Sequence, residues 1–403
     1  MPDLPPEIGA NGESRMANGP SQRRSTTETA KIVTGKPRAS ARSVFQNTPP
    51  GMMRVTLGFA IPLWWIGGCA SASIQSEPVY FPRKPDTPRV VHLKSFNRLD
   101  ELVLIRAGFL DRLRGRIGSS RVGTPAGMAF RNDTLYICDT DDNVVHVWNL
   151  ASGRASRIGD HGPVTLSKPV SVAVDDAGTL FVADTGRGEV VAYPGEADAR
   201  RTFRGNDRES YRPVAAAVRD GRLYVADIAA HSVDAFSIDD GRWIESIGGV
   251  GTSPGRFYFP MGVGFDQKGR LLVSDMMNAR VQRFDVNAAP EISFGSPGNR
   301  LGNLGKPRHV AVGPDEILFV ADAEFAHVHL FDEQGRLLML LGGPHDRAGG
   351  TPMPVGLAVA QALPDAIAAL VPQDFHARYF VFVSNSVGAK RLSLFAVGVG
   401  PAP

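Results

Sequence analysis

The stretch Pro169-Val-Ser-Val-Ala-Val174, followed after a turn by Leu180-Phe-Val-Ala-Asp184, decides the fold of this chain. Closely similar pairs of segments occur six times, and the prolines that open them are spaced by 44, 44, 47, 47 and 47 residues. These prolines are Pro125, Pro169, Pro213, Pro260, Pro307 and Pro354. A period of about 40 to 50 residues made of short apolar strands is typical of β-propellers. We therefore predict an all-β fold with six blades.

The second repeat shows how one blade is built. Residues 170–174 are apolar with small side chains among them, which suits a crowded innermost strand around a channel. Residues 175–178 predict a turn, and residues 179–183 form a nearly continuous apolar strand, as expected when both faces are buried. A third strand at 189–193 and a weaker fourth strand near 199–204 complete the blade.

A polar residue ends the second strand of every repeat. The residues at this position are Asp139, Asp184, Asp227, Asp275, Asp322 and Asn385. Such side chains can accept hydrogen bonds from backbone amides of the following turn. Because a catalytic residue is needed once and a turn cap is needed in every blade, we predict a structural role for them.

The segment Val273-Ser-Asp275-Met-Met-Asn278-Ala-Arg280-Val-Gln-Arg-Phe284 resembles the NHL repeat. The resemblance extends over nearly all of residues 88–398 and implies a six-bladed propeller of the NHL or TolB-like kind. Little chain remains after Phe395 for a fourth strand in the last repeat. We therefore predict that residues 89–96 supply this strand and close the ring, which removes the open sheet edges.

The N-terminal region is predicted to direct export. Residues 1–51 are rich in small, polar and charged residues, and we expect them to be disordered or to precede the true start codon at Met52 or Met53. Residues 52–68 combine a basic start, an apolar run of 12 residues and small residues, which is typical of a signal peptide. The apolar run is short for a transmembrane helix.

The segment Ile66-Gly-Gly-Cys69 resembles the lipobox of bacterial lipoproteins, which implies lipidation of Cys69; ordinary cleavage is the alternative. Residues 69–87 would then be a tether, and Ala70 after the cysteine implies sorting to the outer membrane. With Cys69 acylated, Cys138 would be the one free thiol, and its apolar surroundings predict a buried, inert side chain.

The charge distribution argues against nucleic-acid binding. The chain carries a net charge of +3, but residues 1–68 contain eight Lys and Arg against four Asp and Glu. The predicted propeller is therefore close to neutral and lacks the basic surface of a nucleic-acid binder. We expect a monomer.

Two segments interrupt the repeats. Residues 99–117 have apolar residues at helical spacing and predict an amphipathic helix, packed either on the propeller or against a membrane or partner. Residues 361–377 form an apolar insertion in the last repeat. This insertion predicts a short helix over one channel mouth or part of a docking surface.

Propellers carry functional groups at the channel mouth, where the first strands begin. The candidate ligand-binding residues there are Lys168, Arg212, Lys306, Arg308 and His309. Together they would suit a carboxylate, a phosphate or an acidic partner. The alternative is that each cation pairs with a nearby loop aspartate.

The competing hypothesis is a metal-dependent enzyme, because lyases and lactonases occur on similar propellers. The amidating lyase of peptide hormones resembles these repeats and would imply zinc held by three histidines, but among the positions two after the repeat prolines only His309 is a histidine. Calcium lactonases of related propellers place Asn, Asp and Glu in the channel, where this chain has small apolar residues. The turn containing Asp139, Asp141, Asp142 and Asn143 is a weak calcium candidate. Since the common nucleophile, phosphate-loop and haem motifs are absent, we predict no catalytic residue and no cofactor beyond possible calcium.

These observations favour an envelope lipoprotein facing the periplasm or the cell surface. Its propeller is expected to be a non-catalytic binding platform for another envelope protein or a carbohydrate. The alternative is a metal-dependent propeller hydrolase or lyase, lactonase-like or amidating-lyase-like. The two classes differ in the channel, because an enzyme needs polar ligands that converge there.

Overall fold

The computed structural model describes residues 78–83, 85–103, 121–161, 164–195, 201–205 and 210–401. The chain divides into two compact units, and all described residues belong to the second, residues 73–403. The predicted signal peptide, Cys69, most of the tether and residues 104–117 of the predicted amphipathic helix lie outside the described residues. Those predictions are therefore not addressed by the structure.

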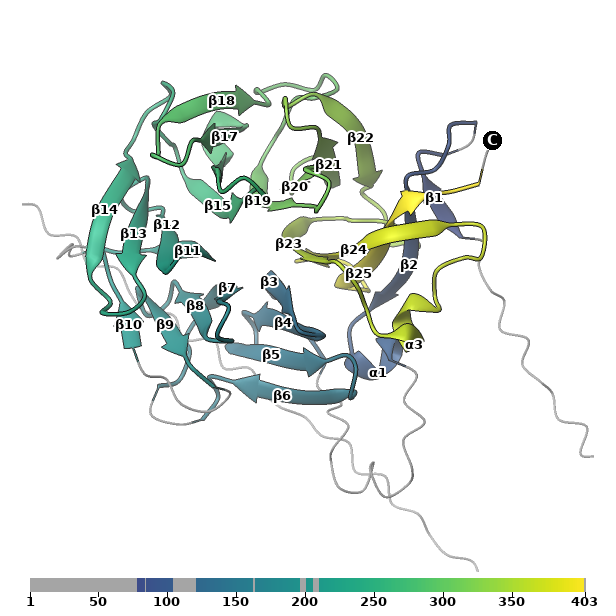
Figure 1. Ribbon diagram of the computed structural model, residues 1–403, viewed down its shortest axis with the longest axis horizontal. Helices are drawn as coiled ribbons and strands as arrows, with labels where there is room; N and C mark the ends of the chain where they lie inside the picture. The colour runs from purple at the N-terminus through teal and green to yellow at the C-terminus, as the bar shows by residue number, and fades with distance from the viewer. Residues whose placement is uncertain are drawn as a thin grey trace, which may run out of the picture. The chain divides into compact units, whose positions relative to one another are not determined.

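Six antiparallel sheets form a ring around a central channel, which confirms the predicted six-bladed propeller (Figure 1). The first three blades are β3 (Pro125–Arg131), β4 (Thr134–Asp139), β5 (Val144–Asn149) and β6 (Arg154–Ile158); β7 (Pro169–Val174), β8 (Leu180–Asp184), β9 (Glu189–Tyr193) and β10 (Arg201–Phe203); and β11 (Pro213–Arg219), β12 (Arg222–Asp227), β13 (Ser232–Ser237) and β14 (Trp243–Gly248). In each blade the proline-led strand is innermost.

The other three blades continue the order. They are β15 (Pro260–Phe265), β16 (Leu271–Asp275), β17 (Arg280–Phe284) and β18 (Pro290–Phe294), with the 3₁₀ turn η1 (Met276–Asn278); β19 (Pro307–Val312), β20 (Leu318–Asp322), β21 (His327–Phe331) and β22 (Leu337–Gly342); and β23 (Pro354–Ala360), β24 (His376–Asn385), β25 (Leu392–Val399), β2 (Val90–Phe96) and β1 (Val79–Phe81).

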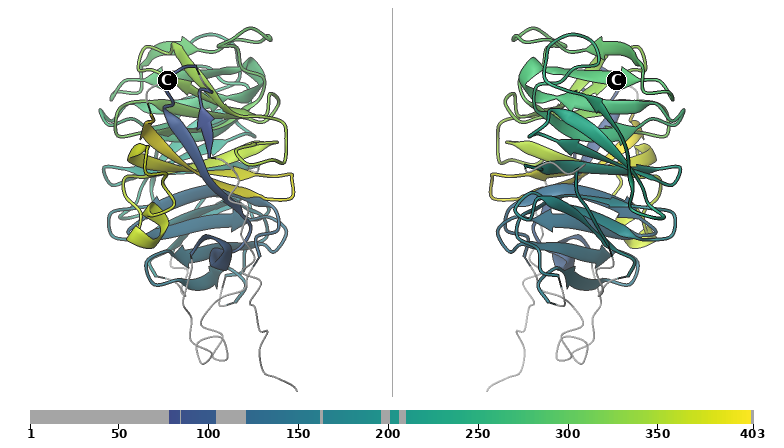
Figure 2. Two further views of the ribbon diagram at one scale, coloured as in Figure 1. Left: turned by 90° about the vertical axis from the view of Figure 1, so that its right-hand side faces the viewer. Right: turned by 90° about the vertical axis from the view of Figure 1, so that its left-hand side faces the viewer.

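The N-terminal strand closes the ring, as predicted. β2 pairs antiparallel with β25, from Val90 opposite Val397 to Phe96 opposite Leu392 (Figure 2). β1 adds a fifth strand to this sheet, although it falls within the predicted tether. The reason is packing, because Phe81 is buried with its ring centroid 6.3 Å from that of Phe395.

The core lies between neighbouring blades. Six hydrophobic clusters of buried residues each join two adjacent blades; the one between the first two contains Val145 of β5 and Val182 of β8. Every residue of β8 is buried, as its continuous apolar sequence predicts. The inner strands approach so closely that a Cβ at Gly356 would lie 2.3 Å from the carbonyl oxygen of Ala126.

Two short helices pack at the seam between the last and first blades. α1 (Leu99–Leu102) and α3 (Asp365–Ala368) contribute Leu99, Leu102 and Ile367 to one hydrophobic cluster. Figure 1 shows α3 at the outer edge of the ring, so the insertion does not cover a channel mouth. Within the described ranges, no helix has the length and apolarity to cross a bilayer.

Candidate ligand site at the channel mouth

One hydrogen bond repeats in all six blades and defines a common face of the propeller. The residue after each second strand donates its backbone N–H to the carbonyl of the residue just before the repeat proline, over 3.0–3.2 Å. The donors and acceptors are Thr140 and Thr124, Thr185 and Lys168, Ile228 and Arg212, Met276 and Phe259, Ala323 and Lys306, and Ser386 and Met353. We call the face formed by these loops, and by the loops that enter the first strands, the mouth face.

The recurrent aspartates hold this face together. Asp322 is fully buried and accepts backbone N–H bonds from Gly305 at 2.6 Å, Lys306 at 2.9 Å and Glu324 at 3.1 Å. The carboxylate thus ties the end of the second strand to the segment that enters the first strand. The other four aspartates accept equivalent bonds, so the predicted capping role is confirmed for all five.

The sixth repeat departs from the predicted cap. The side chain of Asn385 is buried and has no hydrogen-bond partner among the described residues. The end of the following loop is held by Asn97, which accepts the N–H of Arg391 at 2.6 Å and donates to the carbonyl of Ala389 at 2.7 Å. Because Asn97 directly follows β2, the closing strand stabilises the loop that leads into β25.

Among the described residues, one cluster of metal-ligand type combines Asp139 and Asp142 of the predicted calcium turn with His146 of β5. Asp141 and Asn143, the other two predicted residues, are not part of it. Asp139 already accepts backbone amides and the Nε2–H of His146 at 3.1 Å. Burial raises the pKa of Asp139, but the bonds from His146 and the amides outweigh it and hold the pKa well below its usual value. The carboxylate that a metal would need is thus engaged in capping.

The channel opens at the mouth face into a cavity of about 210 Å³. All six residues that directly follow a repeat proline line it, one from each inner strand. They are Ala126, Val170, Val214, Met261, Arg308 and Val355. Five members of this ring are apolar, so Arg308 is its single charged member.

Arg308 has no acidic partner among the described residues. Its Nη1 lies 3.8 Å from the sulfur of Met276, and burial lowers the pKa of its guanidinium. Arginine nevertheless stays protonated at physiological pH. Next to it, His309 also lines the cavity, its Nδ1 lacks a hydrogen-bond partner, and burial lowers its pKa to about 4. At neutral pH the cavity therefore contains one fixed positive charge beside a neutral imidazole.

The structure brings together three of the five predicted ligand-binding residues, since Lys168 lines the cavity with Arg308 and His309. Lys306 is exposed and pairs with Glu324 at 3.2 Å. Arg212 is exposed and does not line the cavity. Pairing with loop aspartates, the alternative considered above, does not occur for the side chains of the four basic candidates within the described residues.

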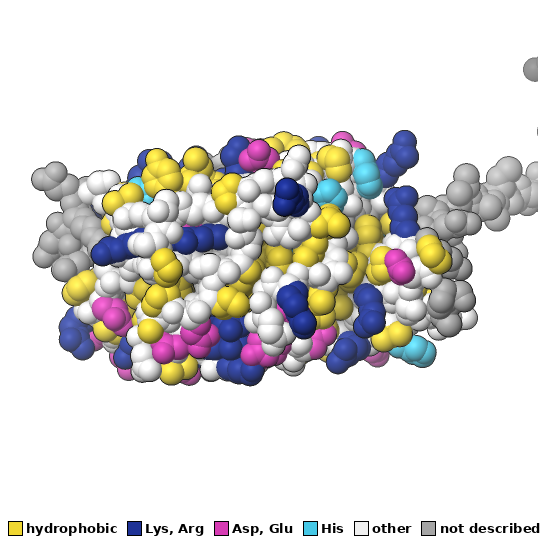
Figure 3. Space-filling view, turned by 90° about the horizontal axis from the view of Figure 1, so that it is seen from above, with side chains coloured by type: hydrophobic (Ala, Val, Ile, Leu, Met, Phe, Trp, Pro, Cys, Tyr) yellow, Lys and Arg dark blue, Asp and Glu magenta, His cyan; other side chains and the backbone are white. Residues whose placement is uncertain are grey.

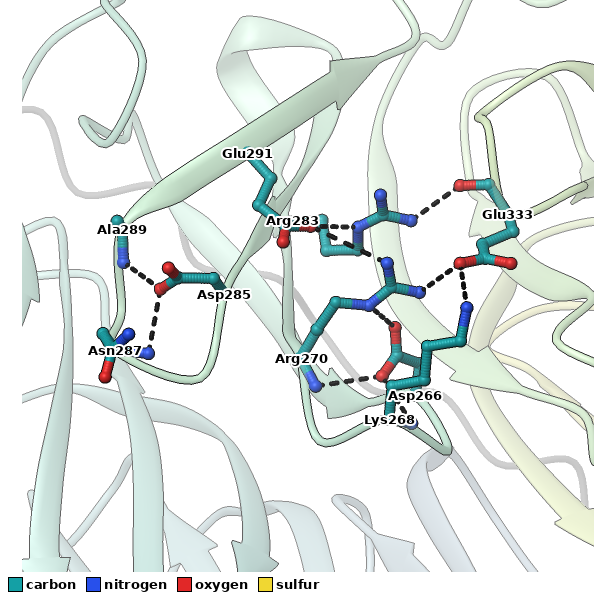
Figure 4. A network of polar contacts seen from close by, with 9 residues as sticks. All are labelled: Asp266, Lys268, Arg270, Arg283, Asp285, Asn287, Ala289, Glu291 and Glu333. Carbon is teal, nitrogen blue, oxygen red and sulfur yellow. Dashed lines mark hydrogen bonds and ion pairs between the residues drawn. The ribbon is translucent and has the colours of Figure 1, made fainter.

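A second polar cluster, which sequence reasoning missed, lies at the turns on the opposite face (Figure 4). Arg270 binds Asp266 at 2.6 Å in its own blade and Glu333 at 2.9 Å in the next blade. Arg283 adds bonds to Glu291 at 2.9 Å and to the carbonyl of Glu333 at 2.6 Å. These groups satisfy one another, so the cluster joins the fourth and fifth blades. The sequence indicated this cluster only through Asp266 and Arg270, which lie four residues apart at the turn after the first strand of the fourth repeat.

The buried thiol lacks the surroundings of a reactive cysteine. Cys138 is fully buried, and burial, with Asp184 and Asp139 nearby, raises its pKa well above the usual range. This agrees with an inert thiol. Among the described residues, the cavity lining contains no carboxylate and a single histidine.

No known protein family and no curated protein matches the chain by sequence. Solved structures resemble it in fold. A protein assigned as a gluconolactonase matches with a TM-score of 0.51 at 14% identity, over 80% of this chain and 96% of that one. Virginiamycin B lyase from Staphylococcus aureus matches with a TM-score of 0.48 at 11% identity, over 68% of this chain and 95% of that one. Regucalcin from Agrobacterium tumefaciens, a calcium-binding protein, matches with a TM-score of 0.48 at 12% identity, over 70% of this chain and 92% of that one. At such identities the likeness concerns the fold alone, and the chain is a six-bladed β-propeller consistent with the NHL type.

Proposed function

We propose that this protein is an exported, lipid-anchored envelope protein whose propeller binds an anionic group of its partner at the mouth face, without catalysis. The observation that carries the proposal is Arg308. It is a partly buried cation without an ionic partner among the described residues, in a cavity whose other ring members are apolar. A charge removed from water without a partner is costly, and a ligand that neutralises it recovers that cost.

The absence of converging metal ligands in the described cavity lining favours binding over hydrolysis. A catalytic zinc site needs three protein ligands around an open position, and calcium needs six to eight oxygens. The lining offers one imidazole and no carboxylate. Lys168 at the cavity edge adds a second positive charge that would attract an anion.

Anion titration followed by NMR tests the proposal. The protein, labelled with ¹⁵N at arginine Nε, is titrated with acetate, phosphate and glucuronate at constant ionic strength. The Arg308 resonance, assigned as the signal lost in Arg308→Met, should shift with at least one of them. Arg154, exposed and without a side-chain partner in the described residues, provides the matched control Arg154→Met. An Arg308 signal that no anion moves would refute the site.

Metal analysis separates this proposal from the enzyme alternative. Protein exported into a periplasm with ample zinc and calcium should contain no stoichiometric metal after purification. A tightly held metal would favour the lactonase-like or lyase-like alternative.

The lipid anchor is tested separately with the variant Cys69→Ser, which should abolish acylation and membrane retention. A variant that is processed and retained like the wild type would exclude the lipid anchor.

A further inference from the structure

Among the described residues, the mouth face also carries most of the large hydrophobic side chains that are exposed. Nine large hydrophobic side chains are exposed among the described residues, and six of them lie in mouth-face loops. These six are Val250, Tyr258, Met277, Leu301, Met353 and Val387. Their exposed fractions run from 38% for Met353 to 82% for Leu301. Exposed apolar residues gathered on one face mark an interaction surface.

The apolar loops are not spread evenly around the channel. They enter or belong to the fourth, fifth and sixth blades, from the loop between β14 and β15 to the loop between β24 and β25. Arg308 lies on β19, the inner strand of the fifth blade, in the middle of this sector. The charged group and the apolar loops therefore belong to the same side of the mouth. Figure 3 shows the rim of the propeller from one side, where acidic side chains along the lower edge are interspersed with Lys and Arg side chains.

The cavity is too small for most complete ligands. Small-molecule sites usually enclose about 300–1,000 Å³, whereas this cavity measures about 210 Å³. It has room for one side chain or chain end. Five ring members are apolar, and hydroxyl side chains also line the cavity at Thr124, Thr140, Ser171 and Ser386. The small volume is therefore the observation that argues against a complete sugar.

We infer that the partner is a polypeptide that inserts one carboxylate into the channel beside Arg308 while apolar residues flanking it pack on the loops of blades four to six. This inference rests on the proposed function and narrows it from anions in general to an acidic group within an apolar peptide surface. Interface hot spots are enriched in arginine and are surrounded by contacts that exclude water, which this arrangement of Arg308 and the apolar loops would provide.

Peptide selection tests the inference. Two random hexapeptide arrays, one with free C-termini and one with amidated C-termini, are probed with labelled wild-type protein. Bound peptides should contain a carboxylate next to apolar residues, and the two arrays distinguish a terminal from a side-chain carboxylate. Selected peptides are then resynthesised and measured by fluorescence anisotropy.

Matched variants define the outcome. Arg308→Met should weaken binding about tenfold or more, as expected when a buried charge pair loses one member. Methionine is tolerated at this ring position, since Met261 occupies it in the fourth blade. Arg154→Met should change affinity less than about twofold, and replacing the peptide carboxylate by its amide should match Arg308→Met. The double variant Tyr258→Ser, Met277→Ser should weaken binding without moving the acetate response of Arg308.

Failure of this inference can be told apart from failure of the proposed function. Arrays that select no peptides, or peptides without a carboxylate, overturn the polypeptide partner, as does binding that Arg308→Met leaves intact. If the Arg308 resonance still responds to acetate or phosphate in that case, the anion site stands and its ligand is of another kind. If the resonance does not respond either, both proposals fall.

Discussion

Replacing Asp139 by alanine should lower the free energy of unfolding much more than replacing its neighbour Asp141 by alanine. Asp139 is fully buried and accepts the backbone N–H groups of Gly123 at 2.7 Å, Thr124 at 3.1 Å and Asp141 at 3.0 Å. It also accepts the Nε2–H of His146 at 3.1 Å. In Asp139→Ala the amide groups and a fully buried imidazole lose their shared acceptor.

The magnitude follows from these bonds. A hydrogen bond to a charged group contributes roughly 1.5–3 kcal/mol, and a buried donor left unpaired costs about 1–3 kcal/mol. Because the amide of Asp141 lies in an exposed turn and can be solvated, we expect about 4 kcal/mol in total rather than the full sum. Asp141→Ala is the control, since the Asp141 carboxylate makes one exposed bond to Thr124 Oγ1 and its loss should cost less than about 1 kcal/mol.

Urea denaturation followed by tryptophan fluorescence and circular dichroism measures both variants. Trp148 is buried in the same blade, with its ring 6.0 Å from that of His146, and reports on this region. A loss below about 1 kcal/mol in Asp139→Ala would refute the capping argument. The measurement is repeated with calcium, because a ligand that binds only the folded state raises its stability. A midpoint that rises with calcium in the wild type and not in Asp139→Ala would instead show that Asp139 is a metal ligand.

Three further predictions concern other parts of the propeller. Burial lowers the pKa of three histidines to about 4, namely His92, His309 and His329. In the unfolded chain these imidazoles bind protons between pH 6.5 and 4, which they do not in the folded protein. The free energy of unfolding should therefore fall as the pH falls through this window, by about 2 kcal/mol per imidazole at pH 5. Equal urea midpoints at pH 7 and pH 5 would contradict this prediction. Arg270→Met should lower the urea midpoint more than Arg336→Met, because Arg336 repeats the same 2.6 Å contact to an aspartate four residues earlier but is far more exposed; equal effects would assign the interblade cluster no special role. Gly356→Ala should cost about 1–3 kcal/mol, since the new Cβ meets the backbone carbonyl of Ala126 at 2.3 Å; unchanged stability would mean that the inner strands can separate without cost.

Sequence patterns predicted most of the fold because each blade repeats the same local requirements. The strands opened by prolines and ended by aspartates follow from hydrophobic periodicity and turn chemistry, which are local. β1 could not be predicted in this way. It is a three-residue strand whose position depends on packing of Phe81 against Phe395, more than 300 residues away. The bonds of Asn97 to the loop before β25 depend likewise on where the closing strand ends.

The sequence predicted where the candidate site lies better than it predicted which side chains line it. Spacing relative to the prolines placed Lys168, Arg308 and His309 near the mouth, and all three line the cavity. The spacing did not predict that the side chain of Lys306 pairs with Glu324 and does not line the cavity. The direction of a long exposed side chain depends on which partner its rotamers reach, and the repeat does not specify that.

The repeat itself shows where to look for function. Six equivalent positions around a narrow channel face the same packing problem, and five of them hold Ala, Val or Met. An arginine at the sixth position places a partly buried charge in a ring of apolar side chains, with no acidic partner among the described residues, so by itself it should destabilise the fold. A residue that costs stability and forms no ion pair within the described part of the chain is explained most directly by something outside the chain. This reasoning predicts that Arg308→Met raises the urea midpoint of the free protein while it weakens ligand binding. A variant that is both less stable and unchanged in binding would show that Arg308 serves the fold and not a ligand.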